Sequence, residues 1–139
     1  MELKIEPGSL FLIAGPCVVE SEDIVRSIGR EVKSICDDLG IPFILKASYR
    51  KANRSSSHSF TGIGDTRALE ILANAANSLG VACTTDIHTD EEAALAAGFA
   101  DILQIPAFLC RQTDLLVAAA KTNKWVNNLS NDYTIHSQS

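Results

Sequence analysis

The chain contains 139 residues, of which 46% are hydrophobic, 21% are charged and only 6% are aromatic. This balance excludes a disordered protein and favours helices packed on an aliphatic sheet over an aromatic-rich β-sandwich. Twelve basic residues against seventeen acidic ones give a formal net charge of −5, which argues against a nucleic-acid-binding or anionic-membrane surface.

The first predicted elements are a strand and a long helix. The apolar run Leu10–Ala14, followed by Gly15, is typical of a strand that is buried on both faces. Ser21 is a suitable N-cap, because acidic residues follow it and apolar residues then recur at helical spacing as far as Leu39. Gly40 ends this pattern, so the sequence predicts a helix between Ser21 and Gly40.

A second strand, a polar segment and a second helix come next. Residues 43–48 read as a strand, and the segment 49–64 is polar with no hydrophobic period. A helix is predicted over residues 66–79, with Asp65 as its N-cap. A connection as long as 49–64 is usually either functional or disordered.

The alternation then repeats twice. Thr89 and Glu92 have the spacing of a capping box, which predicts a helix that ends near Gly98. The other predicted elements are strands at 81–85 and 101–105, a helix at 113–121, and the start of a further strand at 125–127. Strands that alternate with helices in this way predict βαβ units and a parallel sheet.

Two architectures fit this pattern: an open doubly wound sheet and part of a (β/α)8 barrel. The GxGxxG fingerprint of a dinucleotide fold is missing after the first strand, and Gly62-Ile63-Gly64 lacks the Lys-Ser/Thr of a phosphate loop. In a barrel, the carboxyl ends of the strands face the active site. Those ends carry reactive or hydrogen-bonding side chains at four places: Cys17, Lys46, Asp86 and Gln104.

The polar segment concentrates basic residues in an otherwise acidic chain. Four of the twelve cations lie within nine residues, at Lys46, Arg50, Lys51 and Arg54, interleaved with Asn and Ser. Such a set suits phosphate, because Lys supplies a point charge, Arg a bidentate fork and Ser or Asn short donors. The alternative interpretation is a solvated polar loop, and the length of the segment favours a function.

Other candidate residues have structural alternatives. A free cysteine is most often a small buried hydrophobe, which suits Cys36 and Cys83, whereas Cys17 after the first strand could bind a divalent metal or attack an electrophile. Asp86 is either a salt-bridged or capping carboxylate or a group that handles protons or sugar hydroxyls. The three histidines lack metal-site spacing, and the four single cysteines predict reduced thiols. The longest early apolar run is too short for a signal peptide or a membrane span, so a cytoplasmic protein is expected.

Several strings resemble the 3-deoxy-D-manno-octulosonate 8-phosphate synthase family. They are IAGPC at 13–17, KAS at 46–48, KANRSS at 51–56, TDIH at 85–88 and QIPAFLCRQTDLL at 104–116. The resemblance implies a (β/α)8 TIM barrel, of which this chain holds about the first four βα units and the start of the fifth strand. It also implies condensation of phosphoenolpyruvate with D-arabinose 5-phosphate and water, with release of phosphate, for lipopolysaccharide biosynthesis. A related synthase of the deoxy-heptulosonate phosphate type is the alternative within enzymes.

The resemblance also implies roles for individual residues. Lys46 and Lys51 would contact phosphoenolpyruvate, while Asp86 and Gln104 orient the sugar and the reacting atoms. The remaining assignments are substrate-binding Asn53, Arg54, Ser55, Ala107 and Arg111. The cysteine of the Gly-Pro-Cys string marks the metal-dependent class, so Cys17 would bind a divalent ion such as Zn, Fe or Mn. A cytoplasmic homo-oligomer, a tetramer by resemblance, is expected.

The chain also departs from the family pattern. Arg50 stands where the family usually has Asp, and Ser57 where it commonly has Ile. The resemblance ends near residue 127, so we expect a partial barrel at 1–127 followed by a divergent polar tail at 128–139. The metal ligands His, Glu and Asp of the family would lie beyond this part. A non-catalytic fragment that persists by association through an open sheet edge is therefore a further alternative.

Overall fold

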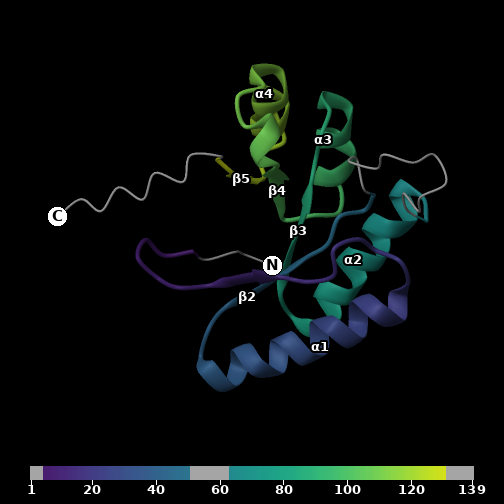
Figure 1. Ribbon diagram of the computed structural model, residues 1–139, viewed down its shortest axis with the longest axis vertical. Coiled ribbons are helices and arrows are strands. Elements are labelled where there is room, and N and C mark those ends of the chain that lie inside the picture. Colours follow the sequence, from purple (N-terminus) through teal and green to yellow (C-terminus); the bar gives the residue numbers. More distant parts are fainter. Residues whose placement is uncertain (1–4, 51–62, 131–139) are drawn as a thin grey trace.

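The computed structural model of the chain describes residues 5–50 and 63–130, in which strands and helices alternate (Figure 1). The elements are β1 (Leu12–Ala14), α1 (Glu22–Leu39), β2 (Phe43–Lys46), α2 (Asp65–Leu79), β3 (Ala82–Asp86), α3 (Asp90–Ala97), β4 (Ile102–Ile105), the 3-10 helix η1 (Ala107–Leu109), α4 (Thr113–Lys121) and β5 (Trp125–Asn128). Every helix and strand expected from the sequence within the described residues is present, and the bounds of α4 agree with the prediction.

The five strands form one parallel sheet in the order β1-β2-β3-β4-β5. A doubly wound sheet reverses its strand order at a switch point, whereas a barrel adds each strand next to the preceding one. The sequential order therefore excludes the doubly wound alternative. The fold is the first part of a (β/α)8 barrel: four βα units and the fifth strand.

The helices pack on one face of the sheet, with α1 beside α2 and α3 beside α4 (Figure 1). Strand residues on that face, such as Leu45 and Leu103, are fully buried together with Leu69 and Leu72 of α2. The ends of α1 are those that the sequence predicts. The Ser21 hydroxyl accepts a hydrogen bond from the Ile24 N–H at 3.3 Å, and Gly40 adopts φ 66° after the last turn.

The opposite face of the sheet holds a smaller apolar cluster. Ile44, Ala82 and Ile102 are buried there, and Ile5, Phe11 and Ile13 pack against them. Side chains of a strand alternate between its faces. Two residues after each buried member, the same face therefore carries Lys46, Thr84 and Gln104, and Asp86 follows Thr84 at the end of β3. The polar ends of the strands lie above this apolar cluster.

Two local predictions were wrong. The first strand is not buried on both faces: Leu12 is 40% exposed and Leu10 is 73% exposed. Among the described residues, β1 is an edge strand that pairs only with β2. Asp65 does not cap α2 either, because Gly64 with φ 107° is the N-cap and Asp65 is the first helical residue. Its carboxylate instead lies 3.7 Å from the guanidinium of Arg50.

Among the described residues, no helix has the length and apolar character needed to cross a membrane. All four cysteines are free thiols. Cys36 and Cys83 are buried, as their interpretation as small hydrophobes requires, whereas Cys17 is exposed.

Candidate active site

The segment that follows β1 is held against the end of β2. A side chain at Gly15 would place its Cβ 1.8 Å from the carbonyl oxygen of Lys46, so only glycine allows this approach. Beyond it, the Ser48 N–H donates to the carbonyl of Cys17 at 3.4 Å, and the Val19 N–H donates to the carbonyl of Ser48 at 2.9 Å. Cys17 is thereby placed beside the carboxyl end of β2.

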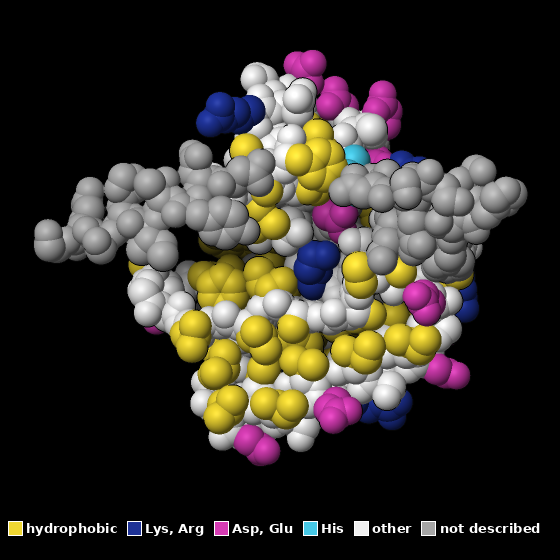
Figure 2. Space-filling model, viewed as in Figure 1, with side chains coloured by type: hydrophobic (Ala, Val, Ile, Leu, Met, Phe, Trp, Pro, Cys, Tyr) yellow, Lys and Arg dark blue, Asp and Glu magenta, His cyan; other side chains and the backbone are white. Residues whose placement is uncertain are grey.

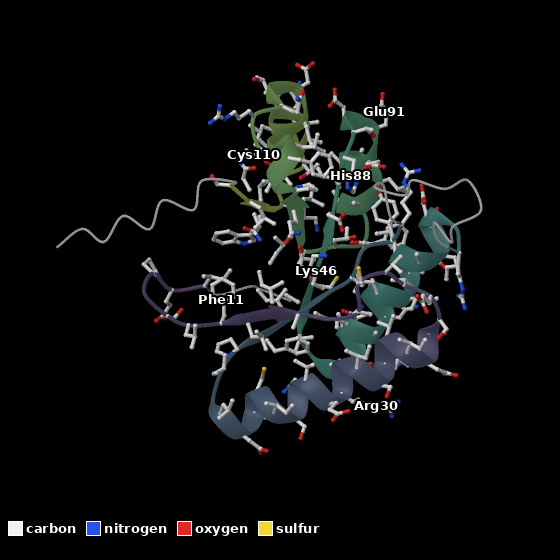
Figure 3. The ribbon with its side chains drawn as sticks, viewed as in Figure 1. Phe11, Arg30, Lys46, His88, Glu91 and Cys110 are labelled. Carbon is white, nitrogen blue, oxygen red and sulfur yellow. The ribbon has the colours of Figure 1, made fainter. Side chains whose placement is uncertain are left out.

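A cavity of about 410 Å³ opens at the carboxyl ends of the strands. Its lining residues come from β2, β3 and β4 and from segments that follow the five strands: Cys17, Lys46, Ser48, Arg50, Asp86, His88, Gln104, Pro106, Ala107, Phe108 and Leu129. Figure 2 shows a basic and an acidic side chain together at the centre of this face, above a band of hydrophobic side chains, and Figure 3 labels Lys46 there. Polar side chains therefore line the cavity where the strands end, and Pro106, Ala107, Phe108 and Leu129 add apolar lining.

Asp86 is the centre of the polar contacts in this cavity. Its Oδ1 accepts a hydrogen bond from the Ser48 hydroxyl and lies 3.7 Å from Lys46 Nζ. Its Oδ2 lies 3.4 Å from His88 Nε2. On the neighbouring strand, Gln104 Oε1 accepts from Asn127 Nδ2 at 3.4 Å, and the amide hydrogens of Gln104 have no partner among the residues that the structure describes.

A second cluster joins the cavity from the side of α3. Glu92 accepts hydrogen bonds from the Arg50 guanidinium and from the N–H groups of His88 and Thr89. The contact to Thr89 completes the capping box that the sequence predicts at the start of α3. Burial alone would raise the pKa of Glu92, but the hydrogen bonds from His88 and Arg50 outweigh it and hold that pKa well below the usual range.

Tyr49 is buried beside this second cluster. Burial raises the pKa of the Tyr49 phenol far above its ordinary value, and the negative charge of Glu92 adds to the effect. The Arg50 guanidinium lies 5.8 Å from the centre of the Tyr49 ring, a cation–π distance. Tyr49 and Arg50, at the start of the polar segment, are therefore anchored and do not form the solvated loop that was the alternative interpretation of the sequence.

The structure brings most of the described candidate residues together. Lys46, Asp86, Gln104 and Cys17 all line the cavity, as expected from their places at the strand ends, and so does Ala107, which the resemblance implied. Arg111 is exposed after η1 and is not among the lining residues. The other candidates lie outside the described residues: Lys51, Asn53, Arg54 and Ser55. The chemical role of each candidate stays a prediction.

Several lining residues were not predicted from the sequence. Ser48 and His88 stand two positions after Lys46 and Asp86, so strand periodicity continued past the strand ends would have placed them on the same face.

Arg50 was predicted to be one of several phosphate-binding cations, yet both of its described ion pairs are with carboxylates of this chain, Glu92 and Asp65. Nothing in the local sequence indicates those partners.

A metal site would need several ligands around one point of the cavity. Cys17 is exposed and faces the cavity, which suits a thiolate ligand. Within residues 5–50 and 63–130, however, no group of three or more His, Cys, Asp or Glu side chains is arranged to hold a metal ion. This part of the chain therefore supplies at most two of the four ligands that a typical zinc site needs.

Comparison with known proteins agrees with the fold and with the cavity. The sequence profile of the DAHP synthetase I family matches residues 6–132. A 2-dehydro-3-deoxyphosphooctonate aldolase of Koribacter versatilis is 52% identical over 126 residues, which cover 91% of this chain and 45% of the relative. Proteins of the same name from Trichlorobacter lovleyi and Cupriavidus taiwanensis are 54% and 53% identical, over 85% and 84% of this chain.

The chain spans less than half the length of these curated relatives, since it covers 45%, 43% and 40% of their sequences. The matched part includes all five strands and every described residue that lines the cavity. On the extent of this match and on the order of its strands, the chain belongs to the DAHP synthetase I family.

Proposed function

We propose that this chain carries part of a site that condenses phosphoenolpyruvate with D-arabinose 5-phosphate and water to give 3-deoxy-D-manno-octulosonate 8-phosphate and phosphate. One observation carries the proposal: Lys46, Asp86 and Gln104, from three neighbouring strands, line a single cavity. The names of the relatives, which are 2-dehydro-3-deoxyphosphooctonate aldolases, support this chemistry over that of a heptulosonate synthase.

The cavity residues have distinct roles in this proposal. The Lys46 ammonium group offsets the negative charge of phosphoenolpyruvate, and Asp86 holds Lys46 in place while its carboxylate accepts hydrogen bonds from sugar hydroxyls. Gln104, fixed by Asn127 through its carbonyl oxygen, donates its amide hydrogens to the substrate. These groups orient two anionic substrates so that the methylene carbon of one meets the aldehyde carbon of the other.

The remaining substrate contacts are proposed from the family resemblance. Lys51 would contact phosphoenolpyruvate, and Asn53, Arg54 and Ser55 would hold the sugar phosphate. The backbone at Ala107, which lines the cavity, would face phosphoenolpyruvate together with Arg111. The mixture of a point charge, a bidentate fork and short neutral donors is what phosphate recognition requires.

A divalent metal is part of the same proposal, with Cys17 as one ligand. The exposed thiol at the cavity edge supports this role. Because the described residues form no complete ligand set, we expect the 139-residue chain to bind such an ion weakly and without selectivity.

Assembly and location follow from the resemblance and are likewise proposals: a cytoplasmic homo-oligomer that serves lipopolysaccharide biosynthesis. Exposed apolar side chains on both edge strands, Leu12 at 40% and Trp125 at 55%, support association. Size-exclusion chromatography with light scattering checks this point, and a stable monomer would contradict it.

A chimera tests the catalytic proposal. Residues 10–127 of this chain replace the matching part of the Koribacter versatilis relative, and phosphate release from phosphoenolpyruvate is followed with arabinose 5-phosphate or erythrose 4-phosphate. We expect turnover with the pentose phosphate, and loss of at least about 100-fold in Lys46→Ala. The exposed control Lys121→Ala should retain activity. Preference for the tetrose phosphate would favour a heptulosonate synthase, and no turnover with either sugar would refute the proposal.

A further inference from the structure

Arg50 lies between two carboxylates that belong to different helices. Its Nη2 donates to Oε1 of Glu92 in α3, and its Nη1 lies 3.7 Å from Oδ2 of Asp65, the first residue of α2. Arg50 itself follows the end of β2 and lines the cavity. One guanidinium therefore connects the segment after β2 to the amino-terminal ends of α2 and α3.

Glu92 connects Arg50 to His88, which in turn contacts Asp86. Its Oε2 accepts from the His88 N–H and lies 3.6 Å from Nδ1 of the His88 ring. The other ring nitrogen, Nε2, lies 3.4 Å from Oδ2 of Asp86, which in turn neighbours Lys46. The imidazole is thus bracketed by two carboxylates, one from the cavity centre and one from the start of α3.

The contacts form a row from Lys46 through Asp86, His88 and Glu92 to Arg50, in which the imidazole lies between the two carboxylates. The Glu92 side chain is only 7% exposed, so it needs a cation to offset the loss of hydration. Arg50 meets that need with the fork that a lysine lacks. Because both ends of the guanidinium face carboxylates of this chain, the geometry favours a structural use of its charge over direct binding of a substrate phosphate.

We propose that Arg50 and Glu92 are a positioning pair, which fixes the His88 ring and the exit of β2 at the cavity without itself touching the ligand. The resemblance implies Asp at position 50, and the reversed charge of Arg50 in this chain is matched by Glu92 and Asp65. The proposal rests on the proposed function only for the choice of phosphoenolpyruvate as the probe.

The test uses the complete 139-residue chain and two readouts. Nuclear magnetic resonance follows the ring signals of His88, and titration with phosphoenolpyruvate gives an apparent dissociation constant. Glu92→Gln is the main variant, because glutamine at this position retains a capping box while it removes the charge opposite Arg50. Arg50→Gln and the double variant test the other residue of the pair, and Arg50→Lys keeps the charge without the fork. The control is Arg67→Gln, an exposed residue whose ion pairs lie on α1 and α2.

We expect Glu92→Gln and Arg50→Gln to shift the His88 ring signals and to raise the dissociation constant about 10-fold each, with the double variant no weaker than the poorer single one. Arg50→Lys should fall between wild type and Arg50→Gln, and Arg67→Gln should stay within about twofold of wild type. If a variant of one residue does not fold, the variants of the other residue test the pair through the same His88 ring signals.

Two results would overturn the proposal. Unchanged His88 signals in Glu92→Gln would show that Glu92 does not position the ring. Weaker binding in Arg50→Gln but not in Glu92→Gln would make Arg50 a direct ligand. If the wild-type chain binds no phosphoenolpyruvate, the proposed function fails for this chain, and the His88 signals alone decide on the positioning pair.

Discussion

On the helix-covered face of the sheet, Leu45, Cys83 and Leu103 are buried in one apolar cluster with residues of all four helices. On the opposite face, the buried cluster consists of Ile44, Ala82 and Ile102, and the strands end in a polar cavity. The two faces alternate residue by residue along the same strands. The helix side therefore holds most of the buried apolar packing, whereas the inner side carries the polar side chains of the candidate site.

The sharpest test of this difference places the same substitution type on both faces. Leu45→Ala removes a fully buried side chain between β2 and the helices, and we expect a loss of about 2–5 kcal/mol in the free energy of unfolding. Ile13→Ala, at a half-buried position on the inner face, should cost about 1 kcal/mol. Urea unfolding followed by circular dichroism measures both values. Equal losses would show that the two faces contribute alike.

The close approach of the segment after β1 to the end of β2 can be tested at Gly15. In Gly15→Ala, the new Cβ would collide with the carbonyl of Lys46, which cannot rotate away as a side chain would. We expect a loss of about 2–3 kcal/mol, at the upper part of the range for overpacking. Gly40→Ala is the matched control, because its Cβ meets no atom within 4 Å and only the left-handed backbone is strained.

That control should cost about 1 kcal/mol, the usual penalty for a side chain at positive φ. The same urea titration measures both glycine variants. If Gly15→Ala is as stable as wild type, the close approach of the two backbones is not a constraint on the site.

The sequence predicted the elements of this fold well because the signals are local. The cap at Ser21, the capping box at Thr89 and the glycine at residue 40 each concern residues a few positions apart. The burial of β1 was predicted wrongly, because burial depends on which strands lie beside it and not on its own apolar run.

The candidate site could be predicted from the sequence to a similar extent. Lys46, Asp86 and Gln104 were found because parallel strands bring their carboxyl ends together. The Arg50–Glu92 contact joins residues 42 positions apart, and no periodicity or motif relates them. The sequence showed a cluster of cations in this segment, but only the fold shows that carboxylates pair with Arg50.

Acid titration tests the contribution of the cavity side to stability. The folded pKa of Glu92 lies below its ordinary value of 4.5, so the unfolded chain takes up a proton first as the pH falls. The stabilisation is therefore complete above about pH 4.5 and is lost below it, with a slope of up to about 1.4 kcal/mol per pH unit for one proton.

Urea unfolding between pH 7 and pH 3 measures that slope, and Glu92→Gln should reduce it. The control Glu91→Gln changes an exposed residue of the same helix and should keep the wild-type slope. An unchanged slope in Glu92→Gln would assign the acid sensitivity to other carboxylates.

The smallest expected effect concerns the thiols, which report on both faces without altering stability. Burial, with Asp101 beside it, raises the pKa of Cys83 on the helix side to about 12, so at pH 8 only about one part in ten thousand of it is thiolate. Cys17 at the cavity is exposed.

Labelling with a disulfide reagent at pH 8 tests this difference. We expect a fast phase of labelling that is abolished in Cys17→Ala and retained in Cys110→Ala. Cys83 should react only as the chain unfolds, so its labelling rate in urea should follow the unfolding transition. Fast labelling of Cys83 in the folded chain would show that the helix-covered face opens more readily than its complete burial implies.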